Sequence, residues 1–134
     1  MKTRTKRMSR DSLAGQSAAP QCFRPDHLTA IRGLLTRHED VREGRMFGYP
    51  AFFIGRRMFA CVYGDGVGIK VPVELAVRLL ERIGTEPFRP HGKSTMREWV
   101  QINHARSKDY QADLCVLLAS IRFVAQGQKS ERRT

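Results

Sequence analysis

The feature that most constrains the fold of this chain is a Gly55-Arg56 pair between two largely apolar runs. The runs cover residues 51–54 and 57–63. Glycine at the first central position of a two-residue loop is typical of the type II′ turn that joins two antiparallel strands. These residues therefore predict a β-hairpin near the middle of the chain.

The hairpin register predicts that both faces of the strand pair are apolar. It pairs Phe52 with Phe59 and Ile54 with Arg57. An antiparallel sheet with one solvated face should alternate apolar and polar residues, so we expect the second face to be covered as well. The cover is the chain's own helices, another subunit or a ligand. The two predicted faces consist of Phe52, Ile54, Phe59 and Cys61 on one side and Ala51, Phe53, Met58, Ala60 and Val62 on the other.

Apolar spacing and turn residues predict the remaining elements. We expect helices over 25–39, 72–83 and 107–125, further strands over 42–47, 67–71 and 96–102, and an irregular loop over 85–95. Ser107 is the expected N-cap of the last helix, and Gly84 the expected C-terminal cap of the second. Because tight turns join neighbouring strands, the predicted class is α+β, with two layers, an antiparallel sheet of four to six strands and three helices. The helix residues expected to be buried are Val73, Ala76, Val77 and Leu80 in the second helix, and Tyr110, Leu114, Leu117, Leu118, Ile121 and Ala125 in the last.

The positive charge of the chain is concentrated at its ends. The 134 residues include 24 Lys and Arg against 13 Asp and Glu, a net charge of +11. The length favours one domain, which we place at 23–125 between disordered basic tails over 1–22 and 126–134. Basic tails attract phosphate without sequence preference, and they are also common solvated ends.

The cysteines and histidines predict neither a disulfide framework nor a zinc site. Cys22, Cys61 and Cys115 are widely spaced, and the four histidines form no ligand spacing with them. We therefore expect no metal or cofactor. The chain shows no secretory signal and no apolar run long enough for a membrane span, so we expect a cytoplasmic protein.

The sequence contains no catalytic motif, and we therefore expect a protein that is not an enzyme. The glycine-rich segment 64–68 lies between two predicted strands, where a turn is favoured over a phosphate-binding loop. Basic and aromatic residues instead gather in the predicted strands and loops. Such residues can bind nucleic acid or an anionic ligand. They are also common as solvent-exposed residues of loops. The candidate binding surface is Arg45, Phe47, Tyr49, Arg56, Arg57, Lys70, Lys93, Arg97 and Trp99.

Several motifs in a fixed order resemble the N-terminal domain of the TfoX/Sxy family. They are Arg45-Met-Phe-Gly48, Gly55 followed by Met58-Phe-Ala60, Lys70-Val-Pro72, Glu86-Pro-Phe88 and Met96-Arg-Glu-Trp-Val100. The resemblance covers about residues 25–125. It implies a bacterial cytoplasmic protein with a compact α+β fold similar to the small YjbR/MmcQ-like proteins, in a family associated with the regulation of competence. It brings no catalytic residues, and two-domain members carry a helical C-terminal domain that is not expected here.

The leading hypothesis is a non-enzymatic binding or regulatory module that acts through a protein partner or as a homodimer. The alternatives are a nucleic-acid-associated protein that uses the basic tails and the hairpin tip, and a small-molecule-binding domain that uses the open sheet face. The candidate dimer face is Phe52, Phe53, Met58 and Phe59.

Overall fold

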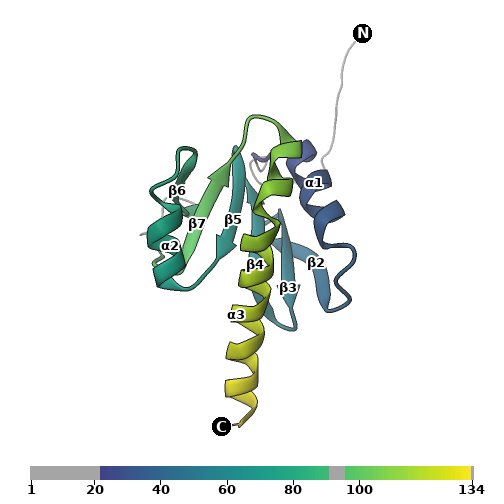
Figure 1. Cartoon of the computed structure of the whole chain (residues 1–134). Helices are drawn as coiled ribbons and strands as arrows, with labels where there is room; N and C mark the ends of the chain where they lie inside the picture. Colours follow the sequence, from purple (N-terminus) through teal and green to yellow (C-terminus); the bar gives the residue numbers. More distant parts are fainter. Residues whose placement is uncertain (1–21, 91–95, 134) are drawn as a thin grey trace.

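The structure is a computed structural model that describes residues 22–90 and 96–133 (Figure 1). The predicted N-terminal tail, apart from Cys22, and the candidate residue Lys93 lie outside the described residues. The elements follow the order α1 (Pro25–Leu35), β2 (Val41–Met46), β3 (Tyr49–Ile54), β4 (Arg57–Tyr63), β5 (Gly66–Lys70), α2 (Val73–Leu79), β6 (Thr85–Pro87), β7 (Trp99–Asn103), the 3₁₀-helix η3 (Ser107–Asp113) and α3 (Leu114–Arg133).

The strands form one six-stranded sheet in the order β2-β3-β4-β5-β7-β6. Every neighbouring pair is antiparallel. Strands β2 to β5 follow one another through tight turns, whereas β7 inserts between β5 and β6. Three helices beside one antiparallel sheet define an α+β fold, which confirms the predicted class.

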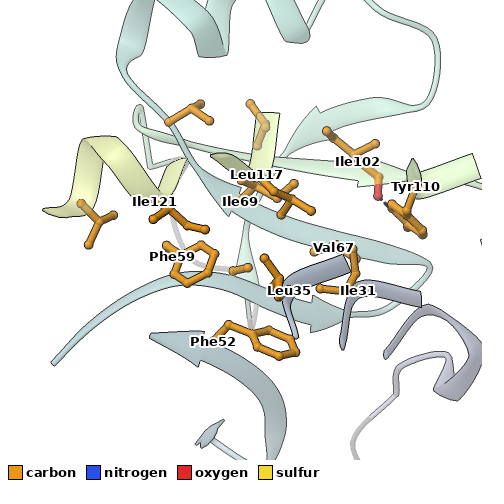
Figure 2. Close-up of a cluster of buried hydrophobic side chains, with 14 of the residues drawn as sticks. Ile31, Leu35, Phe52, Phe59, Val67, Ile69, Ile102, Tyr110, Leu117 and Ile121 are labelled. Atoms are coloured by element: carbon orange, nitrogen blue, oxygen red, sulfur yellow. Dashed lines mark hydrogen bonds between the residues drawn. The ribbon is translucent and has the colours of Figure 1, made fainter. Parts of the chain in front are cut away.

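The three α-helices all pack on the same face of the sheet. Ile31 of α1, Leu79 of α2 and Leu117 of α3 are buried in one apolar cluster with the sheet residues Phe59 and Ile69. Figure 2 shows the residues of α3 lying against the strands in this cluster. Burial of these side chains supplies the apolar surface that holds the two layers together.

The opposite face of the sheet carries a second, smaller cluster to which the helices contribute nothing among the described residues. Its buried members are ring side chains and small residues from β3, β4, β7 and the segment after β6. Side chains of the sheet and its flanking segments therefore cover much of this face. The buried members are Tyr49, Ala51, Cys61, Phe88 and Trp99.

A β-bulge between Phe52 and Phe53 makes the predicted hairpin register wrong beyond its second pair, since Phe53 still pairs with Met58. Ile54 pairs with Arg57 as predicted, but Phe52 pairs with Ala60 rather than with Phe59. One extra residue in a strand moves every following side chain to the other face of the sheet. The turn itself agrees with the prediction, because the φ of Gly55 is +60°. The residues whose predicted face is wrong are Ala60, Cys61 and Val62.

Helix α2 is shorter than predicted and buries a different face. It ends at Leu79, and its buried residues are Ala76 and Leu79. Val77 and Leu80, which were predicted to be buried, are exposed. The apolar residues of this segment cover more of the helix circumference than the sheet can contact. Apolar spacing alone therefore does not show which of these residues are buried against the sheet.

The predicted loop over 85–95 begins with a strand instead. Thr85–Pro87 forms β6 at the edge of the sheet and pairs with β7. The amide of Asn103 donates a hydrogen bond to the carbonyl of Gly84 (2.8 Å), which extends the pairing. Proline lacks an amide donor and is tolerated on an edge strand, so the prolines of this segment do not prevent the pairing.

The helices also differ from prediction at their ends. Helix α1 ends at Leu35 rather than at residue 39. Ser107 starts η3 rather than capping α3, and no side chain caps that start. Helix α3 continues through Arg133, past the predicted end at 125, and Leu118 on it is exposed. No helix of the described residues is both long and apolar enough to cross a membrane.

Candidate functional site

An open groove of about 660 Å³ lies where β5 ends and β7 begins. Its walls come from three parts of the chain: the last residue of β5, the first turn of α2 and the turn that leads into β7. The groove therefore depends on the tertiary fold. The residues that line it are Lys70, Val73, Glu74, Met96, Arg97, Glu98 and Trp99.

Backbone hydrogen bonds fix the geometry of this groove. Lys70 and Trp99 are paired residues of the antiparallel strands β5 and β7. The amide of Val71 donates to the carbonyl of Glu98 (2.9 Å), and the amide of Trp99 donates to the carbonyl of Met96 (3.1 Å). Because both walls are held by hydrogen-bonded backbone, the groove is a preformed feature of the fold.

Trp99 lines the groove and is 8% exposed. Its ring packs against Phe88 with centroids 5.3 Å apart, and Phe88 meets Tyr63 edge to face at 5.6 Å. Tyr63 in turn packs against Tyr49, with centroids 4.6 Å apart. A row of four rings therefore crosses the helix-free face and ends at the groove. Ring pairs of this geometry stabilise one another beyond the apolar area that they bury.

The charges at the rim of the groove balance. Lys70 Nζ lies 3.7 Å from Glu98 Oε1, and both side chains are partly exposed. Glu74 and Arg97 add one exposed charge of each sign. Together with Val73 and the Met96 side chain, the rim surrounds the tryptophan with apolar surface and mixed charge.

Three of the predicted surface residues, Lys70, Arg97 and Trp99, meet at this groove. Arg57 is close by, since it lines a smaller hollow of about 220 Å³ together with Lys70 and Glu98. The sequence interpretation missed the acidic and apolar groove residues. The signal that could have indicated Glu98 is its place in the motif, where it directly precedes Trp99.

The other predicted surface residues do not join the groove. Arg56 lies in the exposed turn between β3 and β4. Arg45, Phe47 and Tyr49 lie around the turn between β2 and β3, at the opposite end of these strands. The predicted surface is thus divided between the two ends of the sheet, because each hairpin reverses the chain.

Phe47 is an unusual residue for its position. Its φ is +49°, and it is 67% exposed at the tip of the β2–β3 turn, followed by Gly48 with a φ of +87°. Two successive positive φ values define the type I′ turn, in which asparagine and glycine are the favoured residues. Left-handed backbone is unfavourable for a bulky residue, so this turn carries local strain.

The four residues of the candidate dimer face lie on opposite faces of the sheet. Phe52 and Phe59 belong to the core under the helices and are buried, so they cannot meet another subunit. Phe53 and Met58 face the other way and are partly buried beside the second cluster. The guanidinium of Arg42 lies 4.8 Å from the centroid of the Phe53 ring, a cation–π contact.

A partly buried polar network joins α1, the segment after α2, β7 and the 3₁₀-helix η3. The Asp113 carboxylate accepts hydrogen bonds from Arg82 (3.0 Å) and from Nε2 of His104 (2.6 Å). The Tyr110 hydroxyl donates to the carbonyl of Ile102 (2.9 Å) and lies 3.1 Å from Nδ1 of His27. Burial raises the pKa of Tyr110 and lowers the pKa of His27. No local pattern indicated this network, because His27 and Arg82 lie far along the chain from Tyr110 and Asp113.

Metal coordination is not evident in the described part of the chain, where no three histidine, cysteine or acidic side chains are placed to hold an ion. Cys61 is buried, and desolvation raises its pKa to about 12. A thiol is a nucleophile only as the thiolate, so this residue is unreactive at neutral pH.

The fold and the groove define a small α+β domain with helices on one face and a row of rings on the other. A family model described as the TfoX N-terminal domain matches residues 33–121. The chain therefore belongs to the TfoX N-terminal domain family, which confirms the resemblance seen in its motifs. No curated protein and no solved structure matches the chain.

Proposed function

We propose that this chain is a non-enzymatic regulatory module that binds a protein partner in the groove beside Trp99. Its membership of the TfoX N-terminal domain family supports a regulatory role, since the family is associated with the control of competence. The observation that carries the proposal is the composition of the groove. Its lining combines the Trp99 ring with the apolar side chains of Val73 and Met96 and with two charged residues of each sign.

The apolar part of the groove suits a side chain of a protein. Binding energy in protein interfaces is concentrated on a few aromatic or arginine residues that fill well-packed pockets. Trp99 and Met96 offer such a pocket, and the sheet holds the tryptophan in place. A polar rim around an apolar centre is the usual arrangement of these interfaces.

The rim argues against phosphate as the ligand of this groove. Glu74 and Glu98 place negative charge beside Lys70 and Arg97. Nucleic-acid binding depends on uncompensated positive charge that displaces counterions from phosphates. Mixed charge instead selects a partner with a complementary pattern and raises its association rate.

The test uses Trp99, the single tryptophan of the chain, as a reporter. Peptides selected from a displayed random library against the full chain are titrated while tryptophan emission is recorded. We expect binding to shift the emission, because a ligand side chain in the groove changes the surroundings of the indole. Met96→Ala should weaken binding about thirtyfold, because truncating an interface anchor typically costs about 2 kcal/mol.

Rim variants and matched controls complete the test. Glu74→Lys and Arg97→Glu should change the affinity and its salt dependence. Arg78→Glu and Glu81→Lys alter exposed charges of the α2 segment outside the groove and should leave binding unchanged. The proposal is wrong if every selected peptide binds without changing the Trp99 emission.

The hairpin tip supports a second candidate function, contact with nucleic acid. Arg56 is exposed in the turn, and Arg42 and Arg57 lie at the same end of the strands. The net charge of +11 would add attraction to phosphate without sequence preference.

A salt titration of duplex DNA tests this candidate. The full chain should bind two unrelated duplexes equally, and its affinity should fall steeply with salt. Arg56→Gln should reduce the slope of log affinity against log salt by about 0.9, the value for one phosphate contact. An unchanged slope would remove the hairpin tip from this function.

A further inference from the structure

The two edges of the sheet differ in what they offer to another chain. Strand β6, at one edge, is three residues long and ends in Pro87. Strand β2, at the other edge, has six residues and no proline. Its outer side pairs with no strand of the described residues. An edge strand of this length presents backbone donors and acceptors to which a further strand can add.

The turn between β2 and β3 determines which backbone groups point outward. Met46 and Tyr49 are paired residues on either side of the two-residue turn 47–48. Residues in this position exchange both hydrogen bonds, and the bonded pairs then alternate along an antiparallel ladder. Every second residue from Met46 therefore bonds to β3. The residues whose backbone groups face away from β3 are Val41, Glu43 and Arg45.

The amide of Val41 already has a partner, since it donates to the carbonyl of His38 at 3.2 Å. This bond agrees with the outward direction of that amide. The amides and carbonyls of Glu43 and Arg45 remain for pairing along the outer edge. These two residues also carry opposite charges.

A second copy of this strand complements the first in a single favourable register. With a two-fold axis through Gly44, Glu43 of each copy lies opposite Arg45 of the other. The pairing forms four backbone hydrogen bonds and two cross-strand ion pairs. An axis through Glu43 would place two carboxylates opposite each other, and one through Arg45 two guanidinium groups. Opposite charges across a strand pair are stabilising and like charges are destabilising.

We propose that two copies of this chain associate through β2, antiparallel and centred on Gly44, so that their sheets become continuous. The proposal does not depend on the ligand of the groove. The groove lies at β5 and β7, which β3 and β4 separate from β2.

The surroundings of Gly44 and Glu43 suit this contact. The central pair of the register is not hydrogen-bonded, and in such pairs the two Cα atoms approach most closely. Glycine leaves room there, and the Phe53 ring lies 3.1 Å from where a Cβ would be. Arg32 donates hydrogen bonds of 2.8 and 2.7 Å to the carboxylate of Glu43. The ion pair lowers the pKa of Glu43 and keeps it charged at the edge.

Charge exchange tests both the interface and its register. The full chain, Glu43→Arg and Arg45→Glu are compared by sedimentation velocity, alone and mixed. The wild type should sediment as a dimer. Each variant alone should be monomeric, because like charges would then lie opposite each other. An equal mixture of the two variants should recover the dimer, because one carries only positive and the other only negative charges at these positions.

Matched controls separate this effect from net charge and from folding. Glu39→Arg and Arg37→Glu make the same charge changes on exposed residues outside β2 and should remain dimeric. Circular dichroism should show that all variants are folded. In the unaltered chain, hydrogen exchange at the amides of Glu43 and Arg45 should slow as the protein is concentrated.

Three results would overturn the proposal as stated. The first is a wild type that stays monomeric at its highest soluble concentration with fast exchange at Glu43 and Arg45. The second is a variant that remains a dimer by itself, which would place the interface elsewhere. A mixture of variants that stays monomeric would contradict the register centred on Gly44.

Discussion

The ring of Phe88 lies over Gly68 so closely that a Cβ on this glycine would come within 2.7 Å of it. Gly68 is in the middle of β5, and Phe88 follows β6 at the edge of the sheet. The ring is completely buried and contacts Tyr63 and Trp99. The absence of a side chain at Gly68 therefore makes room for the row of rings that ends at the groove.

Gly68→Ala should destabilise the protein by about 1–3 kcal/mol, the usual cost of overpacking a core. The added methyl group would force Phe88 out of its position. Urea unfolding followed by circular dichroism measures the change. Gly33→Ala is the matched control, since nothing lies within 4 Å of its Cβ position. This substitution in α1 should stabilise the chain by about 0.5–1 kcal/mol, and equal effects of the two substitutions would refute the packing argument.

Asp113→Ala should lower the free energy of unfolding by about 2–3 kcal/mol. The carboxylate is 1% exposed and accepts hydrogen bonds from Arg82 and His104, both of which would lose a charged partner. Asp109→Ala is the control, because its contact with Arg106 is long (4.0 Å) and exposed. The control should change the stability by less than about 0.5 kcal/mol. Chemical denaturation of both variants in parallel decides the outcome.

The stability of the protein should decrease as the pH falls below about 6.5, the ordinary pKa of histidine. Burial lowers the pKa of His27 in the folded state, so the unfolded chain binds a proton at a higher pH than the folded one. The stabilisation that neutral His27 provides is fully present at a pH above its pKa in the unfolded chain. It is lost as the pH falls towards the lower pKa of His27 in the folded protein. Urea midpoints measured between about pH 7.5 and pH 5 test this.

His27→Gln provides the comparison for the pH series. Glutamine does not titrate, so the variant should be less stable at neutral pH and show a shallower decline on acidification. The carboxyl groups of Asp26 and Glu43 have lowered pKa values and titrate below this window. Parallel curves for the two proteins would show that another group causes the decline.

Cys61 should not react with a thiol reagent until the protein unfolds. It is fully buried, and desolvation raises its pKa to about 12, whereas Cys22 and Cys115 are exposed. A thiol-exchange assay of the native protein should therefore titrate two groups rapidly. The third should react after denaturant is added. Rapid reaction of all three in the native state would contradict the burial of Cys61.

Local sequence was sufficient to predict the class of fold and several of its turns. The φ of Gly55 is positive at the position predicted from the Gly55-Arg56 pair, because glycine accepts this conformation without steric cost. Apolar spacing located the three helices, since a helix must present a continuous apolar stripe to a sheet. The ordered motifs identified the family, which the match over residues 33–121 confirms.

The candidate site could be predicted only in part. The sequence predicts Lys70, Arg97 and Trp99 as surface residues, and they do meet in the groove. It does not predict Val73 and Glu74, because no local pattern reveals that the first turn of α2 lies beside the start of β7. It predicts Arg45 and Phe47 on the same surface, but they lie at the other end of the sheet.

Local residue preferences were enough to predict the three helices, most of the strands, the tight turns and the α+β class, because φ preferences and apolar periodicity act over a few residues. They did not predict β6 or which side chains meet, since both depend on the tertiary packing. The bulge opposite Phe52 moved Cys61 to the helix-free face, and β7 inserted between β5 and β6. In this arrangement the Phe88 ring packs over Gly68. Such contacts depend on the packing of segments that are distant in the chain, so no local sequence pattern predicts them.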